Sequence, residues 1–186
     1  MKPFRVLSRE KILENPFLPV EKQRVIFPNG SEGDWYIARN NDAIIVVAQE
    51  NTEKFIVLQT YKHGGGAVIN EFCAGMVDDG EEPLQAAKRE LREETGFSTD
   101  EAYWHFLGSA FSNPTGASMR YHYFLATHCK KTHETALDAS EQIEVEKISD
   151  WRSVREKFLG HPEKSSAACL GAMALVEKFW AEKNQS

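Results

Sequence analysis

One stretch constrains this chain more than any other: residues 71–97, with the sequence EFCAGMVDDGEEPLQAAKRELREETGF. It predicts a helix that begins near Glu82, because Pro83 suits the first helical position, where a missing N–H costs nothing. Gly80 provides a turn before this helix, and Gly96 suits the left-handed stop after its last turn. Apolar residues recur at spacings of three and four positions along it: Leu84, Ala87 and Leu91. The predicted helix therefore presents one apolar stripe to a core.

The same helix carries three carboxylates on one face. Glu93 and Glu94 lie three and four residues after Glu90, which places all three in a wedge of roughly 100°. Like charges at this spacing destabilise a helix by about 0.2–0.5 kcal/mol per pair, so something should offset the repulsion. A divalent cation would do so, since Mg²⁺ prefers carboxylate oxygens and usually bridges to substrate phosphates. Arg89 can reach Glu93 one turn on, and Glu81 can turn back toward the same wedge.

A simpler interpretation is a solvated acidic face that is neutralised by neighbouring cations: Lys88, Arg89 and Arg92. The glycines favour the metal instead. Gly75 is followed by five residues, then Glu81, then seven residues, then the run RELREETGF that ends at Phe97. This pattern matches the signature of Nudix hydrolases at every specified position, so the chain resembles that family.

The resemblance implies a reaction and a set of site residues. Nudix hydrolases cleave a nucleoside diphosphate linked to another group, using Mg²⁺ or Mn²⁺ as cofactor. Carried over to this chain, the signature makes Glu90, Glu93 and Glu94 metal ligands, with Glu93 also among the catalytic residues. It makes Arg89 and Glu81 their structural support. Only the resemblance supplies the diphosphate substrate.

Length and charge limit the remaining possibilities. The 186 residues suit one domain with a substantial core, and the net charge is −6. No basic run is present, which disfavours binding to nucleic acid or to a membrane by bulk charge. Three widely spaced cysteines show no metal or redox spacing: Cys73, Cys129 and Cys169. We expect free buried thiols in a reducing compartment, and with no export signal or bilayer-length apolar stretch the expected location is the cytoplasm.

The segment before the helix predicts strands. Residues 17–38 form strands around the turn at 28–30, and 43–48 and 54–60 are apolar runs typical of buried strands. The residues at 61–66 break the second run, and another strand starts at 68–72. The N-terminal part carries aromatic residues but little core of its own, so it should pack on the rest of the chain or on a second copy.

The segment after the helix predicts strands at 104–111, 121–127 and 143–148, with a loop at 112–116 and a polar, mobile loop at 130–140. Asp150 caps a short helix to about Phe158, and Ser165 or Ser166 caps a last helix. The fold class is α/β with a mixed sheet, and the resemblance implies the Nudix α/β/α sandwich. We expect a β extension over residues 1–39 and the Nudix domain over 40–186.

Flanking residues resemble one subgroup, the ADP-ribose and ADP-sugar pyrophosphatases. The run Glu71–Gly75 is similar to its Glu-x-Pro-Ala-Gly stretch, although Cys73 replaces the usual Pro, and there the carbonyl of Ala74 would join the metal ligands. The loop at 113–116 resembles the Ser-Pro-Gly loop of the subgroup, with one extra residue. The resemblance implies these substrate-binding residues: Trp35, Lys62, Glu71, Thr115 and Gly116.

Two of these assignments have simpler alternatives. In the subgroup the N-terminal strands reach across a homodimer, so Trp35 would stack on a base that the other chain binds. Alternatively Trp35 is a packed core or interface aromatic. Lys62 stands where the subgroup has Arg in a Gln-Phe-Arg segment, and the alternative for it is a solvated surface charge.

A general base is needed to take the proton of the attacking water. In the ADP-ribose group it is a Glu on a late loop shortly before a strand, and the segment 140–145 resembles that loop, which makes Glu141 the candidate. Asp138 and Glu144 are the alternatives, and Glu144 ranks lower because it should alternate with apolar neighbours on the strand.

Three functions are compatible with these residues. The first is metal-dependent hydrolysis of ADP-ribose or a related nucleoside diphosphate sugar to a nucleoside monophosphate and a sugar phosphate. The second is Nudix hydrolysis of another diphosphate, such as GDP-mannose, a dinucleotide or a nucleoside triphosphate. The third is a module that binds ADP-ribose without cleaving it, which the intact signature carboxylates disfavour.

Overall fold

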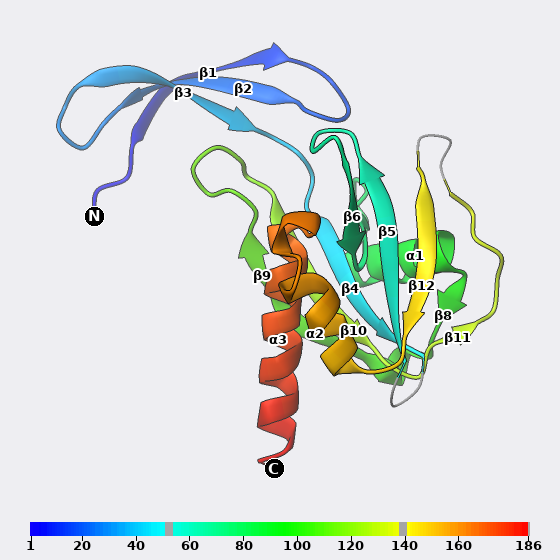
Figure 1. Ribbon diagram of the computed structural model, residues 1–186. Helices are drawn as coiled ribbons and strands as arrows, with labels where there is room; N and C mark the ends of the chain where they lie inside the picture. The colour runs from blue at the N-terminus through cyan, green and yellow to red at the C-terminus, as the bar shows by residue number, and fades with distance from the viewer. Residues whose placement is uncertain (51–53, 138–140, 186) are drawn as a thin grey trace. The chain divides into compact units, whose positions relative to one another are not determined.

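The apolar run at 43–48 forms the centre of a seven-stranded mixed sheet in the computed structural model, which describes residues 1–50, 54–137 and 141–185 (Figure 1). β4 (Ala43–Gln49) pairs in parallel with β10 (Arg120–Ala126). On the other side of β4, the first half of the strand pairs with β7 (Cys73–Met76), and the end of the strand pairs with β5 (Phe55–Lys62). Both pairings are antiparallel. Nearly every residue of β4 is buried, as a strand at the centre of a covered sheet requires.

The remaining strands extend this sheet on both sides. β12 (Ile143–Ile148) pairs antiparallel with one edge of β5, and β6 (Ala67–Glu71) pairs with the second half of β5. β9 (Trp104–Phe111) lies next to β10 at the opposite edge. The chain thus leaves β6 at Phe72 and enters β7 directly, which brings the start of the signature against the middle of the sheet.

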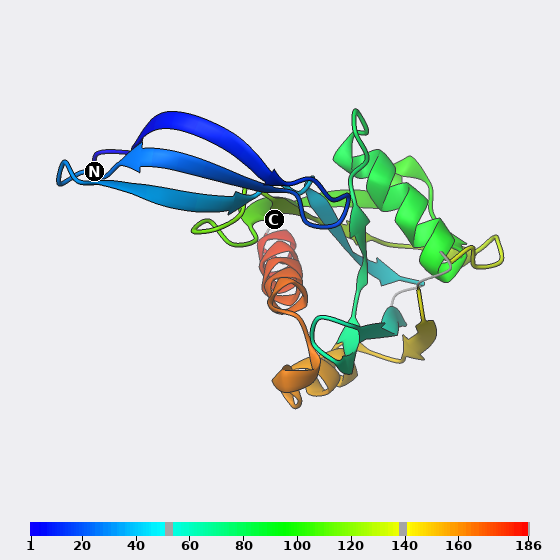
Figure 2. The same ribbon diagram turned by 90° about the horizontal axis from the view of Figure 1, so that it is seen from above.

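Alternating side chains of β4 face two separate apolar cores. Ile44 and Val46 pack with α1 (Pro83–Thr95) on one face. Ile45 and Val47 pack with α2 (Trp151–Leu159) and α3 (Ala167–Lys183) on the other face. Figures 1 and 2 show α1 on one side of the sheet and α2 and α3 on the other. The predicted α/β sandwich with a mixed sheet is confirmed.

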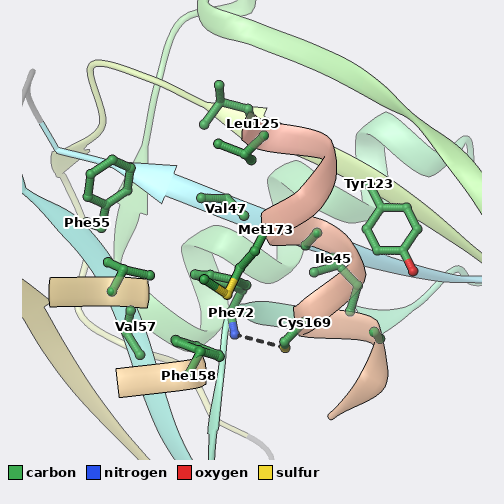
Figure 3. Close-up of a cluster of buried hydrophobic side chains, with 14 of the residues drawn as sticks. Ile45, Val47, Phe55, Val57, Phe72, Tyr123, Leu125, Phe158, Cys169 and Met173 are labelled. Atoms are coloured by element: carbon green, nitrogen blue, oxygen red, sulfur yellow. Dashed lines mark hydrogen bonds between the residues drawn. The ribbon is translucent and has the colours of Figure 1, made fainter. Parts of the chain in front are cut away.

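The core under α2 and α3 is built around aromatic rings and a cysteine (Figure 3). Phe72 stacks on Phe158 with 4.6 Å between ring centroids, and its backbone N–H donates to Sγ of Cys169 over 3.5 Å. All three cysteines are free and buried, as predicted. Burial raises the pKa of the Cys129 and Cys169 thiols to about 12, so both remain protonated near neutral pH.

The helix ends follow the predicted capping residues. Gly96 ends α1 in the left-handed region, with φ 74°, and its N–H donates to the carbonyl of Arg92 over 2.8 Å. The Asp150 carboxylate accepts the N–H of Ser153 at the start of α2. Of the two predicted caps for α3, Ser166 is the one whose side chain accepts a backbone N–H, that of Cys169.

The described residues divide into two compact units. The first, called here the N-terminal unit, comprises residues 1–42 and 110–120; the second, called here the body, comprises residues 43–109 and 121–186. The N-terminal unit contains an antiparallel sheet of three strands: β1 (Arg5–Leu13), β2 (Val20–Ile26) and β3 (Glu32–Ala38). Residues 110–120 join this unit through backbone hydrogen bonds between Ala38 and the segment at 116–118.

Several strands differ from the sequence-based prediction. Residues 5–13 form β1, which their many charges obscured, because pairing with β2 satisfies the backbone whatever the side chains are. β5 continues through Tyr61 and Lys62, where a break was predicted, because β6 pairs with it to the end. The signature loop contains β7, which pairing with β4 induces.

Short elements complete the chain. β8 (Phe97–Ser98) pairs with β11 (Lys130–Lys131), so the loop predicted over 130–140 begins as a strand. The N–H groups of Thr132 and His133 donate to the carbonyl of Gly96, and the N–H of Ala136 donates to that of Glu93, so this segment is tied to the end of α1. The described part of the chain also contains two 3₁₀ turns: η1 (Glu101–Tyr103) and η2 (Pro162–Lys164). Among the described residues, no helix combines the length and the apolar character needed to cross a membrane.

Candidate active site

Arg89 is the centre of the signature cluster. Its Nε and Nη2 donate to the two carboxylate oxygens of Glu81 over 3.2 and 3.0 Å, a bidentate pair. Nη1 donates to Glu90 over 2.7 Å and to Glu93 over 3.3 Å. Nη2 also donates to the carbonyl of Met76 over 2.9 Å. The predicted contacts of Arg89 with Glu93 and of Glu81 with the wedge are therefore present in one network.

This network shifts the pKa of its members. The hydrogen bond from Arg89 holds the pKa of Glu81 below its ordinary value, and Glu81 in turn is the largest cause of the raised pKa of Arg89. The Asp78 N–H donates to Glu81 over 3.1 Å and lowers the pKa of Glu81 further. Arg89 and Glu81 thus remain a fixed charged pair that anchors the helix to the loop before it.

Glu94 is the deeply buried member of the wedge, with 5% of its surface exposed. Its Oε2 accepts the backbone N–H of Ala74 over 3.1 Å. Burial raises the pKa of Glu94 to about 8, although hydrogen bonds from the Cys73 thiol and the Ala74 N–H oppose the rise, while the charges of Glu90 and Glu141 add to it. A carboxyl in this position loses its proton readily only when a cation compensates its charge.

Glu90 lies directly against the backbone of Gly75. A Cβ placed on Gly75 would come within 2.0 Å of Oε1 of Glu90, so the first glycine of the signature is required by this close approach. Burial raises the pKa of Glu90, Arg89 opposes the rise, and the charges of Glu93 and Glu141 add to it, so that the net pKa is raised. Strand β7 thus holds Ala74 beside Glu94 and Gly75 beside Glu90.

These residues fit a site for a hard divalent cation, because oxygen donors of like charge are crowded together and two of them have raised pKa values. The carboxylates of the wedge are not positioned to coordinate one ion together. Within residues 1–50, 54–137 and 141–185, no group of three or more His, Cys, Asp or Glu side chains is arranged to hold a metal ion. The reason is visible in the contacts, since Arg89 lies between Glu90 and Glu93 while Glu94 accepts from Ala74.

The three candidates for the general base differ in position. Glu141 lies near enough to the wedge for its charge to raise the pKa of both Glu90 and Glu94. Glu144 lies on the other side of β12, because Ile143 packs into the core under α1 and neighbouring side chains on a strand alternate. Asp138 is outside the described residues.

Lys62 and Glu71 form an ion pair, with Nζ 2.7 Å from Oε2. Burial lowers the pKa of Lys62, but the charge and hydrogen bond of Glu71 outweigh it, so the pKa is raised and the side chain remains cationic. The side chain of Lys62 is thus both ion-paired and 45% exposed. Both residues come from the β5–β6 hairpin, in which Lys62 lies on a strand where a break was predicted.

The N-terminal unit brings together the other predicted substrate contacts. The indole Nε1 of Trp35 donates to the carbonyl of Thr115 over 3.0 Å, and the carbonyl of Gly116 accepts the N–H of Ala38. The Trp35 ring packs edge-to-face on Phe4, with 5.3 Å between centroids, and more loosely on Phe27. The two segments are 80 residues apart in sequence, so their pairing was not predictable from spacing.

Two groups in the cluster were not identified from the sequence as functional. The carbonyl of Met76 accepts from Arg89, and the thiol of Cys73 donates to Glu94. No sequence pattern marks a carbonyl acceptor. Cys73 did stand out as a departure from the usual Pro of the subgroup, and this was the available signal for the thiol contact.

Comparison with known proteins agrees with this geometry. The NUDIX domain family matches residues 39–167, and the nucleoside diphosphate sugar hydrolase N-terminal domain matches residues 4–38. A methanol dehydrogenase activator from Bacillus methanolicus is 29% identical over 142 residues, 76% of each chain. An ADP-ribose pyrophosphatase from Bacillus subtilis is 27% identical over 146 residues, 78% of each chain. The crystal structure of an ADP compounds hydrolase matches all of this chain and 98% of its own, with a TM-score of 0.85 at 21% identity, which shows a shared fold.

Proposed function

The chain belongs to the NUDIX domain family, and from this premise we propose that it hydrolyses the diphosphate bond of ADP-ribose or a related nucleoside diphosphate sugar. Water attacks one phosphorus of the diphosphate, and the products are a nucleoside monophosphate and a sugar phosphate. The observation that carries the proposal is the convergence of Glu81, Glu90 and Glu93 on Arg89, beside the buried Glu94. The N-terminal domain match and the named function of the Bacillus subtilis relative support a nucleotide sugar as the substrate.

Mg²⁺ or Mn²⁺ is the proposed cofactor. Its ligands would be the carboxylates of the wedge and one carbonyl: Glu90, Glu93, Glu94 and Ala74. When bound, such a cation neutralises charge on phosphate oxygens and makes a bound water more acidic. The crowding of these carboxylates supports the assignment, because only a cation or protons can compensate them where burial raises their pKa.

The other residues of the body act without a metal contact. Arg89 and Glu81 support the wedge through their bidentate pair, which ties the helix that carries the carboxylates to the loop before it. We assign the general base to Glu141, which would take the proton of the attacking water. Its proximity to Glu90 and Glu94 supports this choice over Glu144, and Asp138 remains the alternative.

The substrate contacts are assigned on the resemblance. Lys62, kept cationic by Glu71, would bind a phosphate oxygen, and Glu71 would orient it. Trp35 would stack on the base, with Thr115 and Gly116 in the neighbouring loop. The hydrogen bond from Trp35 to Thr115 supports treating them as one binding element.

The proposed assembly is a homodimer in which N-terminal strands are exchanged, and the proposed location is the cytoplasm. The apolar side chains exposed on the N-terminal unit support the dimer, with Phe17 exposed to 85%. Three free, buried cysteines support a reducing compartment.

The decisive experiment measures release of nucleoside monophosphate, by chromatography, from ADP-ribose, ADP-glucose, GDP-mannose, UDP-glucose, NADH and nucleoside triphosphates. Each substrate is assayed with Mg²⁺, with Mn²⁺ and with EDTA. We expect ADP-ribose or another nucleotide sugar to lead and EDTA to abolish turnover. Turnover of triphosphates or dinucleotides alone would contradict the substrate assignment. Binding of ADP-ribose without turnover would contradict the proposed hydrolysis and favour a function as a binding module.

A pair of variants tests the base. Glu141→Gln should lower kcat by a factor of about 10²–10⁴, the usual contribution of general base catalysis, with little change in KM. Glu144→Gln is the matched control, since it changes a carboxylate three residues away on the other face of β12. Equal losses in both variants, or full turnover in Glu141→Gln, would refute the assignment.

A further inference from the structure

A cavity of about 420 Å³ lies in the body, and its lining residues include none of the signature cluster. Ala74 pairs with Ile45 in the first half of β4, whereas Gln49 at the end of the strand lines the cavity. Ile45 and Gln49 are four residues apart on β4, which corresponds to about 13 Å along the strand. The cavity is also on the other face of the sheet, because it is lined by Leu125 and Trp180 of the core under α3, while the wedge is on α1. It is therefore separate from the candidate active site.

Aromatic rings form much of the wall. The ring of His128 stacks on Tyr103, with centroids 4.3 Å apart and planes inclined by 28°. The ring of His105 lies against Phe179, with 4.9 Å between centroids. Such faces suit a planar ring, because stacking is tolerant of the identity of the base or heterocycle.

The polar groups of the wall favour an anion. Lys183 lines the cavity, with Nζ 4.8 Å from the centroid of Phe179. Burial, and then the charge of Lys183, lowers the pKa of His105, so this ring is a neutral donor or acceptor near pH 7. The described residues that line the cavity include no carboxylate. The described lining residues therefore offer one cation, two imidazoles and aromatic faces to a negative ligand.

The backbone at His128 is held in an uncommon conformation. Its φ is 56°, and among the described residues it is the one non-glycine residue with a positive φ. The neighbouring peptides are fixed, since Thr127 N–H donates to Tyr103 over 3.0 Å and Cys129 N–H donates to Gln49 over 2.9 Å. Left-handed conformations of this kind cluster at ligand-binding positions, where the surroundings enforce them. Here the conformation accompanies the stacking of the imidazole on Tyr103.

We propose that this cavity is a second ligand site, which binds a planar heteroaromatic anion of the nucleoside monophosphate class between the His128–Tyr103 stack and Lys183. The site is independent of hydrolysis, so it goes beyond the function proposed above. The ring of the ligand would lie on the aromatic wall, and its phosphate would pair with Lys183.

Calorimetric titration of AMP into the full chain in EDTA tests the proposal without metal or turnover. We expect AMP to bind, and adenosine and inorganic phosphate each to bind at least about tenfold more weakly, because each offers only one of the two contacts. His128→Gly removes the ring but keeps the positive φ without strain, and should weaken AMP binding about tenfold. Lys183→Met should do the same, whereas Lys178→Met on the same helix, outside the cavity, should not.

Two outcomes would overturn the site. One is the absence of AMP binding at millimolar concentration. The other is binding that His128→Gly and Lys183→Met leave unchanged, which would assign it elsewhere. Adenosine binding as tightly as AMP would overturn the anion assignment. Failure of the nucleotide-sugar assay leaves all these results valid, because none of them depends on turnover.

Discussion

β2 and β4 are both seven residues long, yet they bury very different amounts of surface. Six residues of β4 are buried, because helices cover both faces of its sheet. In β2 only Gln23 and Val25 are buried, and no other residue of the N-terminal unit is. The body therefore has two cores of its own, whereas the N-terminal sheet is held by backbone pairing and needs another surface to bury its apolar side chains.

The two units also differ in chemistry. The body contains the carboxylates, the guanidinium that orders them and the candidate base, all suited to reaction at phosphorus. The N-terminal unit contains aromatic rings and a loop with backbone acceptors, suited to binding a base. On this comparison, changes in the body should affect kcat or stability, and changes in the N-terminal unit should affect KM or association.

The largest effect is expected for Glu94→Gln in the body. Glu94 is one of the proposed metal ligands, and its loss should lower kcat about 10³-fold, since a bound metal contributes several kcal/mol to stabilising charge in the transition state. The metal-free fold should be retained at pH 7, because the pKa of about 8 means that Glu94 is then largely protonated and Gln resembles it. Steady-state kinetics and thermal melting in EDTA measure the two quantities. Glu101→Gln, at an exposed carboxylate, is the control, and activity within tenfold of wild type would break the assignment.

Leu91→Ala tests the stability side of the comparison. Leu91 is fully buried between α1 and the sheet, so its truncation should lower the free energy of unfolding by about 2–5 kcal/mol. Leu7→Ala in β1, at a side chain 47% exposed, should change it by less than about 0.5 kcal/mol. Urea denaturation monitored by tryptophan fluorescence measures both. Similar losses would mean that the N-terminal sheet has a core of its own.

The sequence predicted the features that depend on local spacing. Helix α1 with its glycine stop, the reach of Arg89 to Glu93 and the return of Glu81 all follow from residues a few positions apart. It did not predict β1 or β7, because strands of charged or glycine-rich sequence form only when a distant partner supplies the hydrogen bonds. The contact of Gly75 with Glu90 depends on that same pairing, so the reason for the signature glycine became clear only in three dimensions.

Trp35→Ala tests the chemical side of the comparison in the N-terminal unit. Loss of the proposed stacking on the base should raise KM for a nucleotide sugar about tenfold and leave kcat nearly unchanged. Trp35→Phe keeps an aromatic face and removes only the hydrogen bond to Thr115, so it should have the smaller effect. Initial-rate kinetics over a range of substrate concentrations separate the two parameters. A fall in kcat at constant KM would place Trp35 with the catalytic machinery and break the comparison.

A smaller, pH-dependent effect is expected where α2 meets α3. Burial raises the pKa of Glu177, but hydrogen bonds from Trp151 and Arg155 outweigh it, so the net pKa lies below the ordinary 4.5. A lowered pKa stabilises the fold above about pH 4.5, and this stability is lost as pH falls through the folded pKa. Glu177→Gln should therefore melt below wild type at pH 7 and approach it at about pH 3. Asp34→Asn, at an exposed carboxylate of β3, should change the melting temperature at pH 7 by less than Glu177→Gln does. An equal or larger change would contradict the comparison.

The smallest effect on the stability of the isolated chain is expected for Phe17→Ala. This side chain is 85% exposed, so its truncation removes little buried surface and should change the unfolding free energy by less than about 0.5 kcal/mol. The N-terminal unit has several other exposed apolar side chains: Phe4, Leu7, Ile12, Leu13, Leu18 and Tyr36. If a second copy covers them, Phe17→Ala should raise the dimer dissociation constant about tenfold, as truncation of a buried anchor does. Sedimentation over a concentration series measures the dissociation constant. A monomeric wild-type mass at micromolar concentration would mean that no second copy covers these residues, and would contradict the inference that the N-terminal sheet needs a partner.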